Sequence, residues 1–283
     1  MTGYLAILGA VFIWAIFNGY LVKKIRTSGV GVGTWTSFVG VMLFFIFFVL
    51  NGKEFPSLNQ NQIIGLLCLG TFAALNNACN YTGIKISMVN TLLFHYLAPL
   101  LIPIWALTIP VFQSNIRTVD LIALFVGLCG MIWIGVPNFR GNKKWLYFAS
   151  ASAFFYSLEI VFSGYVSNRL NVAADISALT KLSGQVIIMP LVAVLLRESL
   201  RVESKREIPW LILGGAMLYF SFILYFSGSA TVSDMHRGIL GYIDRIGAIA
   251  IGAYFFKEER DNVNKNTLIG GALILGAGLL VML

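Results

Sequence analysis

Five acidic or basic residues lie inside long apolar stretches of the sequence, where a charge is energetically unfavourable. They are His95, Glu159, Lys181, Asp244 and Arg245. A charged side chain at the centre of a bilayer costs about 2.5 kcal/mol or more unless it finds a partner or a water-filled cavity. Such residues are candidates for a substrate path. Glu159 and Asp244 are also candidates for proton coupling, because burial favours the neutral form of a carboxyl group.

Each of these residues also has a purely structural interpretation. Asp244 and Arg245 could each bind a partner on another helix and only hold the helices together. Neighbouring residues point about 100° apart around a helix, so these two are not expected to pair with each other. Lys181 lies near the start of its apolar segment and could instead extend to the membrane surface. His95 is either a packing residue or a group that changes charge near neutral pH.

Aromatic side chains could complete a binding site with these charges. Trp14 and Tyr156 occupy similar places in the first and sixth apolar segments, as Tyr96 and Tyr242 do in the fourth and ninth. Aromatic rings attract cations, so together with the carboxylates they could hold an ammonium group. The basic residues could hold a carboxylate. This mixture of signs favours a zwitterion, such as an amino acid, over a simple cation or anion.

Amide side chains crowd the third apolar segment. Asn76, Asn77 and Asn80 precede Tyr81 there, and each amide must either hydrogen-bond a neighbouring helix or face water. Both alternatives remain open. The full set of candidate substrate-binding residues is Trp14, Asn77, Asn80, Tyr81, His95, Tyr96, Tyr156, Glu159, Lys181, Tyr242, Asp244 and Arg245.

The composition predicts that lipid surrounds the elements carrying these residues. The 283-residue chain is 58% hydrophobic and 11% charged, whereas soluble domains are about one quarter charged. Ten apolar segments approximate the length of a membrane span, and backbone groups in lipid must be satisfied within a helix. These segments are 4–22, 32–50, 63–83, 89–112, 121–136, 145–166, 176–196, 209–228, 238–256 and 268–283. We therefore expect an all-α polytopic membrane protein with ten transmembrane helices.

The two halves of the chain resemble each other. A shift of 145 residues places Gly83 on Gly228, and a shift of 143 places Gly127 on Gly270. Residues 1–138 and 139–283 thus form two predicted five-helix repeats. Because five is odd, the second repeat must cross the membrane in the opposite orientation, which is the inverted-repeat plan of secondary transporters.

The net charge of +8 is carried mostly by short loops between the apolar segments. With Lys85 and Arg237 counted as loop residues, the odd-numbered loops hold 14 lysines and arginines and the even-numbered loops hold 4. Basic loops mark the cytoplasmic side, so both termini are predicted to lie outside the cell. This distribution makes the charge a topological signal, and no nucleic-acid partner is expected.

Several chemistries have no motif in the sequence. Cys68, Cys79 and Cys129 lack metal-ligand spacing, and the chain has no nucleophile elbow and no phosphate-binding loop. We therefore predict no enzyme, no metal and no cofactor. The duplicated halves already supply what a dimer of shorter chains would need, so a monomer is expected.

Four stretches carry a family resemblance: "GYLAILGAVFIWAIFNGYLVKK", "FHYLAPLLIP", "GYIDRIGAIAIGAYFFKEE" and "LIGGALILGAG". Together with the five-plus-five duplication, they resemble the drug/metabolite transporter superfamily in its EamA branch, over essentially the whole chain. Members often have a Leu-Glu-Pro-like step in the ninth span and an acidic residue that closes it. Ile243-Asp244-Arg245 stands at that step here, and Glu258 and Glu259 close the span. Arg245 departs from the usual proline, so the resemblance carries over no substrate.

The resemblance implies a secondary active transporter of the plasma (inner) membrane that exports a small polar metabolite by alternating access. The residues favour an amino acid or similar zwitterion, with protons as a coupling ion. Two alternatives remain: a carrier of cationic or nucleoside-like metabolites such as S-adenosylmethionine, and a membrane protein with a structural role and no transport activity.

Overall fold

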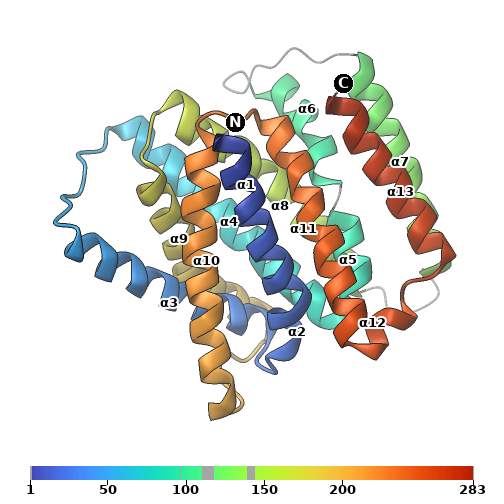
Figure 1. Ribbon diagram of the computed structural model, residues 1–283, viewed down its shortest axis with the longest axis horizontal. Coiled ribbons are helices and arrows are strands. Elements are labelled where there is room, and N and C mark those ends of the chain that lie inside the picture. Colours follow the sequence, from blue (N-terminus) through green and yellow to red (C-terminus); the bar gives the residue numbers. More distant parts are fainter. Residues whose placement is uncertain (1, 96, 110–117, 139–143, 283) are drawn as a thin grey trace.

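The computed structural model describes residues 2–95, 97–109, 118–138 and 144–282, and these residues form helices joined by short connections (Figure 1). The helices are α1 (Thr2–Ile16), α2 (Val22–Lys24), α3 (Gly29–Leu50), α4 (Gln60–Ile86), α5 (Met88–His95), α6 (Ala98–Thr108), α7 (Thr118–Asn138), α8 (Lys144–Gly164), α9 (Ala174–Leu196), α10 (Ile208–Ser229), α11 (Asp234–Phe255), α12 (Lys257–Asp261) and α13 (Lys265–Met282). The described residues contain no strand, which confirms the all-α prediction.

Eight helical segments of the described residues are long and apolar enough to cross a membrane. They coincide with the first four predicted segments and with the sixth to the ninth. The fifth and tenth predicted segments are the helices α7 and α13, and α7 contains a shorter apolar stretch, Leu121–Gly130. The chain is thus a multi-pass membrane protein, while the total of ten spans stays a prediction.

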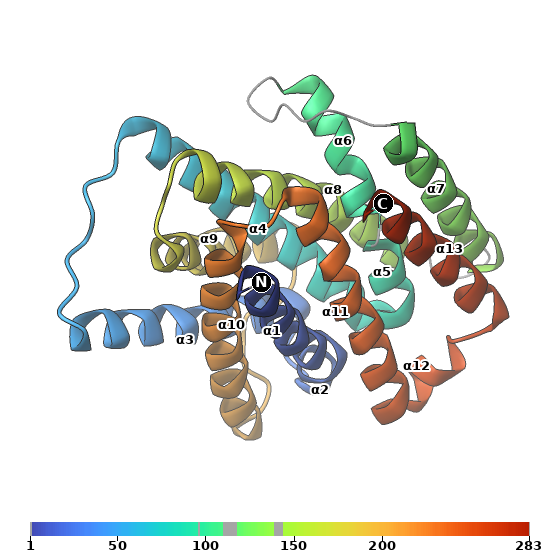
Figure 2. The same cartoon turned by 45° about the horizontal axis from the view of Figure 1, so that its top comes forward.

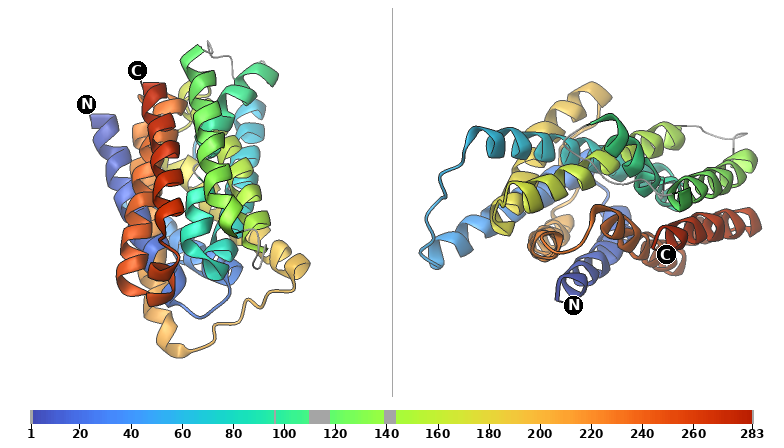
Figure 3. Two further views of the ribbon diagram at one scale, coloured as in Figure 1. Left: turned by 90° about the vertical axis from the view of Figure 1, so that its right-hand side faces the viewer. Right: turned by 90° about the horizontal axis from the view of Figure 1, so that it is seen from above.

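Helices of the first half of the chain pack against helices of the second half. α1 contacts α10 and α11, and the corresponding helix of the second half, α8, contacts α4, α5 and α6. α3 lies against α9, and α7 lies beside α13 at one edge of the molecule (Figures 1 and 2). Helices of both halves therefore surround the centre of the bundle, as the view from above also shows (Figure 3).

The first and sixth membrane segments each contain one wider, π-helical turn. These turns span Phe17–Leu21, between α1 and α2, and Tyr165–Arg169, directly after α8. The first turn coincides with the pentapeptide FNGYL at 17–21, and the second overlaps the last two residues of the similar pentapeptide FSGYV at 162–166, 145 residues later. Gly19 allows α11 to approach closely, because a Cβ there would lie 2.5 Å from the carbonyl oxygen of Ala248.

The fourth membrane segment is broken, and the ninth is continuous. α5 ends at His95 and α6 begins at Ala98, with Pro99 in the first turn of α6. Proline has no backbone N–H and its ring excludes a preceding helical turn, so it suits a helix start. Arg245 occupies the corresponding region of α11 and keeps its amide, and α11 runs unbroken from Asp234 to Phe255.

Glutamates of the second half accept hydrogen bonds from backbone amides of the first half. One of them, Glu259, belongs to α12, which lies at the end opposite the two termini (Figure 1). Glu207 accepts hydrogen bonds from the backbone amides of Arg26 and Thr27, at 3.0 and 3.3 Å. Glu259 accepts from the backbone amides of Met88 and Val89, at 3.2 and 3.1 Å, where α5 begins. A carboxylate is favourable at a helix N-terminus because the unpaired N–H groups carry partial positive charge.

Two residues counted as loop residues in the sequence are helical. Lys85 lies in the last turn of α4 and donates to the carbonyl oxygen of Ile25. Arg237 lies in α11, where it is buried and bound to Asp234. That assumption was therefore wrong for both residues, although the excess of basic residues in the odd-numbered loops persists without them.

Candidate functional site

A small cavity at the centre of the bundle has a volume of about 20 Å³, which is room for about one water molecule. Small-molecule sites occupy roughly 300–1,000 Å³, so a metabolite could bind here only after the lining side chains move apart. Six membrane segments contribute side chains to it. The lining residues are Trp14, Phe17, Asn18, Asn76, Asn77, Asn80, Tyr81, Tyr156, Lys181, Leu218, Phe222, Asp244 and Arg245.

Eight of the twelve candidate residues line this one cavity: Trp14, Asn77, Asn80, Tyr81, Tyr156, Lys181, Asp244 and Arg245. Glu159 and His95 lie directly behind it, each hydrogen-bonded to a lining residue. Tyr242 lies elsewhere, in a buried cluster with Val89 and Leu93. Tyr96 falls outside the described residues.

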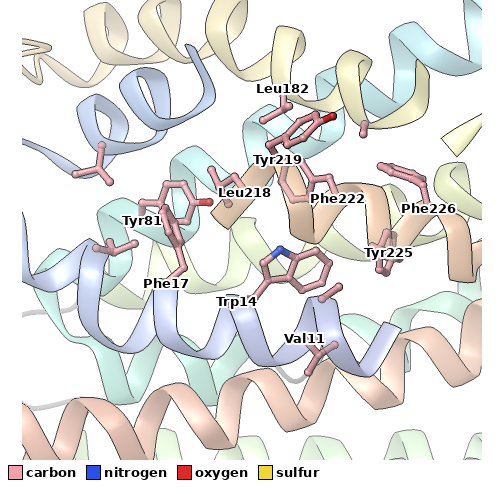
Figure 4. Packing of buried hydrophobic residues seen from close by; sticks show 14 of the residues in the cluster. Val11, Trp14, Phe17, Tyr81, Leu182, Leu218, Tyr219, Phe222, Tyr225 and Phe226 are labelled. Atoms are coloured by element: carbon pink, nitrogen blue, oxygen red, sulfur yellow. The ribbon is translucent and has the colours of Figure 1, made fainter. Parts of the chain in front are cut away.

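Lys181 and Glu159 form a buried ion pair beside the cavity. Lys181 Nζ donates to Glu159 Oε1 at 2.5 Å, and neither side chain exposes more than 4% of its surface. The ammonium group also lies 4.1 Å from the ring centroid of Phe222 and 5.2 Å from that of Trp14. Figure 4 shows Trp14 of α1 facing Phe222 and Tyr225 of α10. The interpretation of Lys181 as an interfacial residue was therefore wrong, because its partner lies inside the bundle.

Asp244 and Arg245 lie within ion-pair distance of each other, contrary to the expectation from helical geometry. Arg245 Nη1 is 3.1 Å from Asp244 Oδ2, and both side chains are buried. The two Cα–Cβ bonds diverge, but the long arginine side chain bends back toward the carboxylate. Asn18, in the first π turn, donates to the other carboxylate oxygen of Asp244 at 3.3 Å.

A chain of hydrogen bonds connects these two charge pairs. Arg245 Nη2 lies 2.9 Å from His95 Nε2, and His95 Nδ1 lies 2.8 Å from Ser152 Oγ. Ser152 donates to Asn76 Oδ1 at 2.8 Å, and Asn76 Nδ2 donates to Glu159 Oε2 at 2.8 Å. Residues of α11, α5, α8 and α4 are thus joined behind the cavity wall.

Four polar atoms of the cavity lining have no hydrogen-bond partner among the described residues. They are Asn18 Oδ1, Asn80 Oδ1, Asp244 Oδ2 and Arg245 Nη1. The last two are close to each other but are not in hydrogen-bond geometry. Buried polar atoms in proteins are normally paired, so each unpaired one calls for an explanation. Three acceptors and one donor therefore face one cavity, where water or a polar ligand could satisfy them.

Five lining residues were not among the candidates drawn from the sequence. Asn18 and Asn76 carried a usable signal, because an amide inside an apolar segment needs a polar partner. Phe17, Leu218 and Phe222 carried none, since apolar residues facing a cavity look the same in sequence as those facing lipid. Two supporting serines were also missed: Ser152, in the hydrogen-bond chain, and Ser221, which accepts from Trp14 Nε1 at 2.8 Å.

The described residues contain no group of three His, Cys, Asp or Glu side chains that could hold a metal ion. The charged groups around the cavity are instead arranged as two pairs of opposite sign.

Comparisons with known proteins agree with a transport fold. Residues 143–283 match the model of the EamA-like transporter family. A solved protein, described only as a crystal structure of a protein, is 16% identical, with a TM-score of 0.65. The alignment covers 98% of this chain and 96% of that one, so the two share a fold over their whole length. No curated protein matches the chain in sequence.

Proposed function

Since this chain belongs to the EamA-like transporter family of the drug/metabolite transporter superfamily, we propose that it carries a zwitterionic metabolite, such as an amino acid, across the membrane. Family members are membrane transporters and not enzymes, and the eight membrane-length helices agree with that assignment. The proposed mechanism is alternating access, in which the two halves rock about the central cavity.

The unpaired atoms of the cavity carry the proposal for the substrate class. An ammonium group has three N–H donors and no acceptor. Asp244 Oδ2, Asn18 Oδ1 and Asn80 Oδ1 are three acceptors that could receive them. Arg245 Nη1, which lies 3.1 Å from Asp244 Oδ2 without a hydrogen bond to it, could turn to bind a substrate carboxylate. Lys181 Nζ is hydrogen-bonded to Glu159, whereas Arg245 Nη1 makes no hydrogen bond among the described residues, so Arg245 is the carboxylate ligand that we propose.

Several features support ten spans in two inverted repeats, residues 1–138 and 139–283. The pentapeptides at 17–21 and 162–166 are similar, and a π turn coincides with the first and overlaps the end of the second. The packing of α1 on α10 has its counterpart in the packing of α8 on α4. An internal duplication with opposite orientations produces both relationships.

The basic loops support an orientation in the plasma (inner) membrane with odd-numbered loops in the cytoplasm and both termini outside. In this orientation the glutamates at 198, 207 and 259 lie at the cytoplasmic end. Export is the proposed direction, from the family resemblance, with protons as the proposed coupling ion. Glu159 and Asp244 are two carboxylates to test for proton coupling.

A carrier of cationic or nucleoside-like metabolites is the second candidate, because aromatic rings border the cavity. Lys181 already lies over the rings of Phe222 and Trp14, and Arg245 lies 5.5 Å from the ring centroid of Tyr156. A ligand with only positive charge would be repelled by both residues. S-Adenosylmethionine carries an amino-acid group as well as a cation, so it is compatible with both interpretations.

A matched set of ligands separates these candidates. We would measure the thermal unfolding of detergent-purified protein with each L-amino acid, with the amine that lacks its carboxylate and with the acid that lacks its ammonium group. Only intact zwitterions are expected to stabilise the protein, and Asp244→Asn should abolish that effect. Asp175→Asn, in the exposed ion pair with Lys53, is the control and should keep it. Stabilisation by the amine alone would favour the cation carrier. No stabilisation by any member of the set would favour a structural role.

A further inference from the structure

His95 accepts the hydrogen bond from Arg245. A guanidinium group has only donors, so the contact of 2.9 Å requires that His95 Nε2 carries no proton. In a neutral imidazole the hydrogen then lies on Nδ1, which donates to Ser152 Oγ at 2.8 Å. Ser152 is free to accept because its own hydrogen points to Asn76 Oδ1. The geometry thus selects one tautomer of the neutral ring.

The chain of hydrogen bonds ends at Glu159, whose carboxylate can only accept. Asn76 directs its amide nitrogen to Glu159 Oε2, because a carboxylate can only accept, and this leaves its oxygen for Ser152. Lys181 occupies the other oxygen of Glu159. The donor and the acceptor of every hydrogen bond between Arg245 and Glu159 are therefore fixed. Because the negative charge on Glu159 sets the orientation of Asn76, it also determines which tautomer His95 adopts.

Among the described residues, the charged and titratable groups next to the ring come from two helices. Arg245 of α11 binds its Nε2, and Tyr156 of α8 lies with its ring centroid 4.5 Å away. Asp244 lies one side chain further, behind Arg245, and Glu159 lies at the far end of the hydrogen-bond chain. From α4, the polar neighbour is Asn76, through Ser152.

We propose that His95 is a proton-binding site of the transporter and that its neutral form positions Arg245 for the substrate. A proton on Nε2 would take the place of the hydrogen bond from Arg245 and set two positive groups against each other. Arg245 would then lose the contact that holds Nη2, and with it the orientation of Nη1 at the cavity. Proton binding and substrate binding therefore oppose each other, as an exchange of protons for substrate requires. This inference rests on the proposed function.

His95 is better suited to this role than Glu159. A proton on Glu159 would weaken its ion pair with Lys181 but leave the contact between Arg245 and His95 in place, whereas a proton on His95 Nε2 removes that contact directly. A proton also cannot pass along the chain from His95 to Glu159, because the amide of Asn76 does not exchange the roles of its nitrogen and oxygen. The hydrogen bonds between His95 and Glu159 therefore fix the orientation of the side chains but do not transfer protons.

One experiment needs no substrate. The chain has two histidines, His95 and His236, so protein labelled with ¹⁵N-histidine gives two sets of ring signals. His236→Gln assigns the remaining set to His95. At about pH 8, where histidine is normally neutral, we expect the Nδ1–H tautomer of His95. The opposite tautomer would overturn the proposal whatever the protein transports.

The second experiment uses the L-amino acid that most stabilises the wild-type protein, with its affinity measured from about pH 8 to about pH 5. For one competing proton, the affinity should fall toward about tenfold per pH unit below the histidine pKa. His95→Gln supplies an oxygen acceptor that does not titrate, so its affinity should stay constant. His236→Gln should keep the wild-type dependence. Wild-type affinity that is independent of pH, or His95→Gln that keeps the dependence, would overturn the proposal and leave the proposed function standing. Absence of binding by any amino acid would remove the proposed substrate, and the tautomer would still test His95.

Discussion

Lys181 on α9 donates to Glu159 on α8 across 2.5 Å in the interior of the bundle, where both side chains are almost fully buried. Removing one member of such a pair leaves an unpaired buried charge, which is far less favourable than removing both. Glu159→Gln should therefore lower the free energy of unfolding by about 3 kcal/mol or more. The double variant Glu159→Gln/Lys181→Met should recover much of that loss. Thermal unfolding in detergent measures both.

The control for this prediction is the exposed pair of Lys53 and Asp175, at 2.7 Å. The hydrogen bond from Lys53 to Asp175 raises the pKa of Lys53, but the lysine side chain is about half exposed. Exposed pairs contribute about 1 kcal/mol or less, so Asp175→Asn should have little effect. Equal effects of Asp175→Asn and Glu159→Gln would show that burial does not govern the Lys181–Glu159 pair.

Glu258 and Glu259 provide a second matched comparison, because both lie within salt-bridge distance of Lys23. Glu259 is buried and also binds the first two amides of α5, whereas the side chain of Glu258 is 68% exposed. Glu259→Gln should destabilise the protein by about 1–3 kcal/mol, since it weakens bonds to a charged acceptor. Glu258→Gln should change it by less than about 1 kcal/mol. Thermal unfolding that ranks the two variants in the opposite order would contradict the capping role of Glu259.

Gly19 is predicted to set the distance between α1 and α11. A Cβ at this position would lie 2.5 Å from the carbonyl oxygen of Ala248, and backbone atoms cannot move aside as a flexible side chain can. Gly19→Ala should therefore lower the melting temperature. Among the described residues, no neighbouring atom lies within 4 Å of the methyl group that Gly276→Ala would add in α13, so this change should be neutral or slightly stabilising. A neutral effect of Gly19→Ala would show that the two helices can separate without loss.

Arg245→Lys should weaken zwitterion binding by about tenfold or more, because an ammonium group cannot hold His95 and a substrate carboxylate in the fixed geometry of a guanidinium. Titration calorimetry with the amino acid selected by thermal unfolding measures the loss. Arg206→Lys is the control. Arg206 lies in the connection before α10, and its variant should bind the amino acid as the wild type does. Wild-type affinity in Arg245→Lys would place the carboxylate elsewhere.

The orientation can be tested with cysteines in opposite loops. After replacement of the three native cysteines by serine, Glu54→Cys lies in the connection between α3 and α4, and Glu258→Cys lies in α12. An impermeant maleimide applied to intact cells should label position 54 and should not label position 258. The reverse pattern would invert the predicted topology.

The sequence by itself determined that lipid surrounds this protein, that its fold is all-helical and which residues are candidates for the site. Apolar segments of membrane length predict helices, because no other local structure satisfies every backbone group in lipid. Intramembrane charges such as Glu159 and Asp244 indicated a polar interior, because charges facing lipid are costly. These conclusions depend only on residue type and local spacing.

Only the tertiary structure decided which of these groups meet. Lys181 finds Glu159, and Arg245 finds His95 150 residues earlier in the chain. Phe222 faces the cavity although its sequence surroundings are as apolar as those of residues facing lipid. Contacts between helices depend on the rotation and position of each helix within the bundle, which local periodicity does not specify. The bend of Arg245 toward Asp244 depends on its surroundings for the same reason, because a long side chain adopts the rotamer that its buried neighbours stabilise.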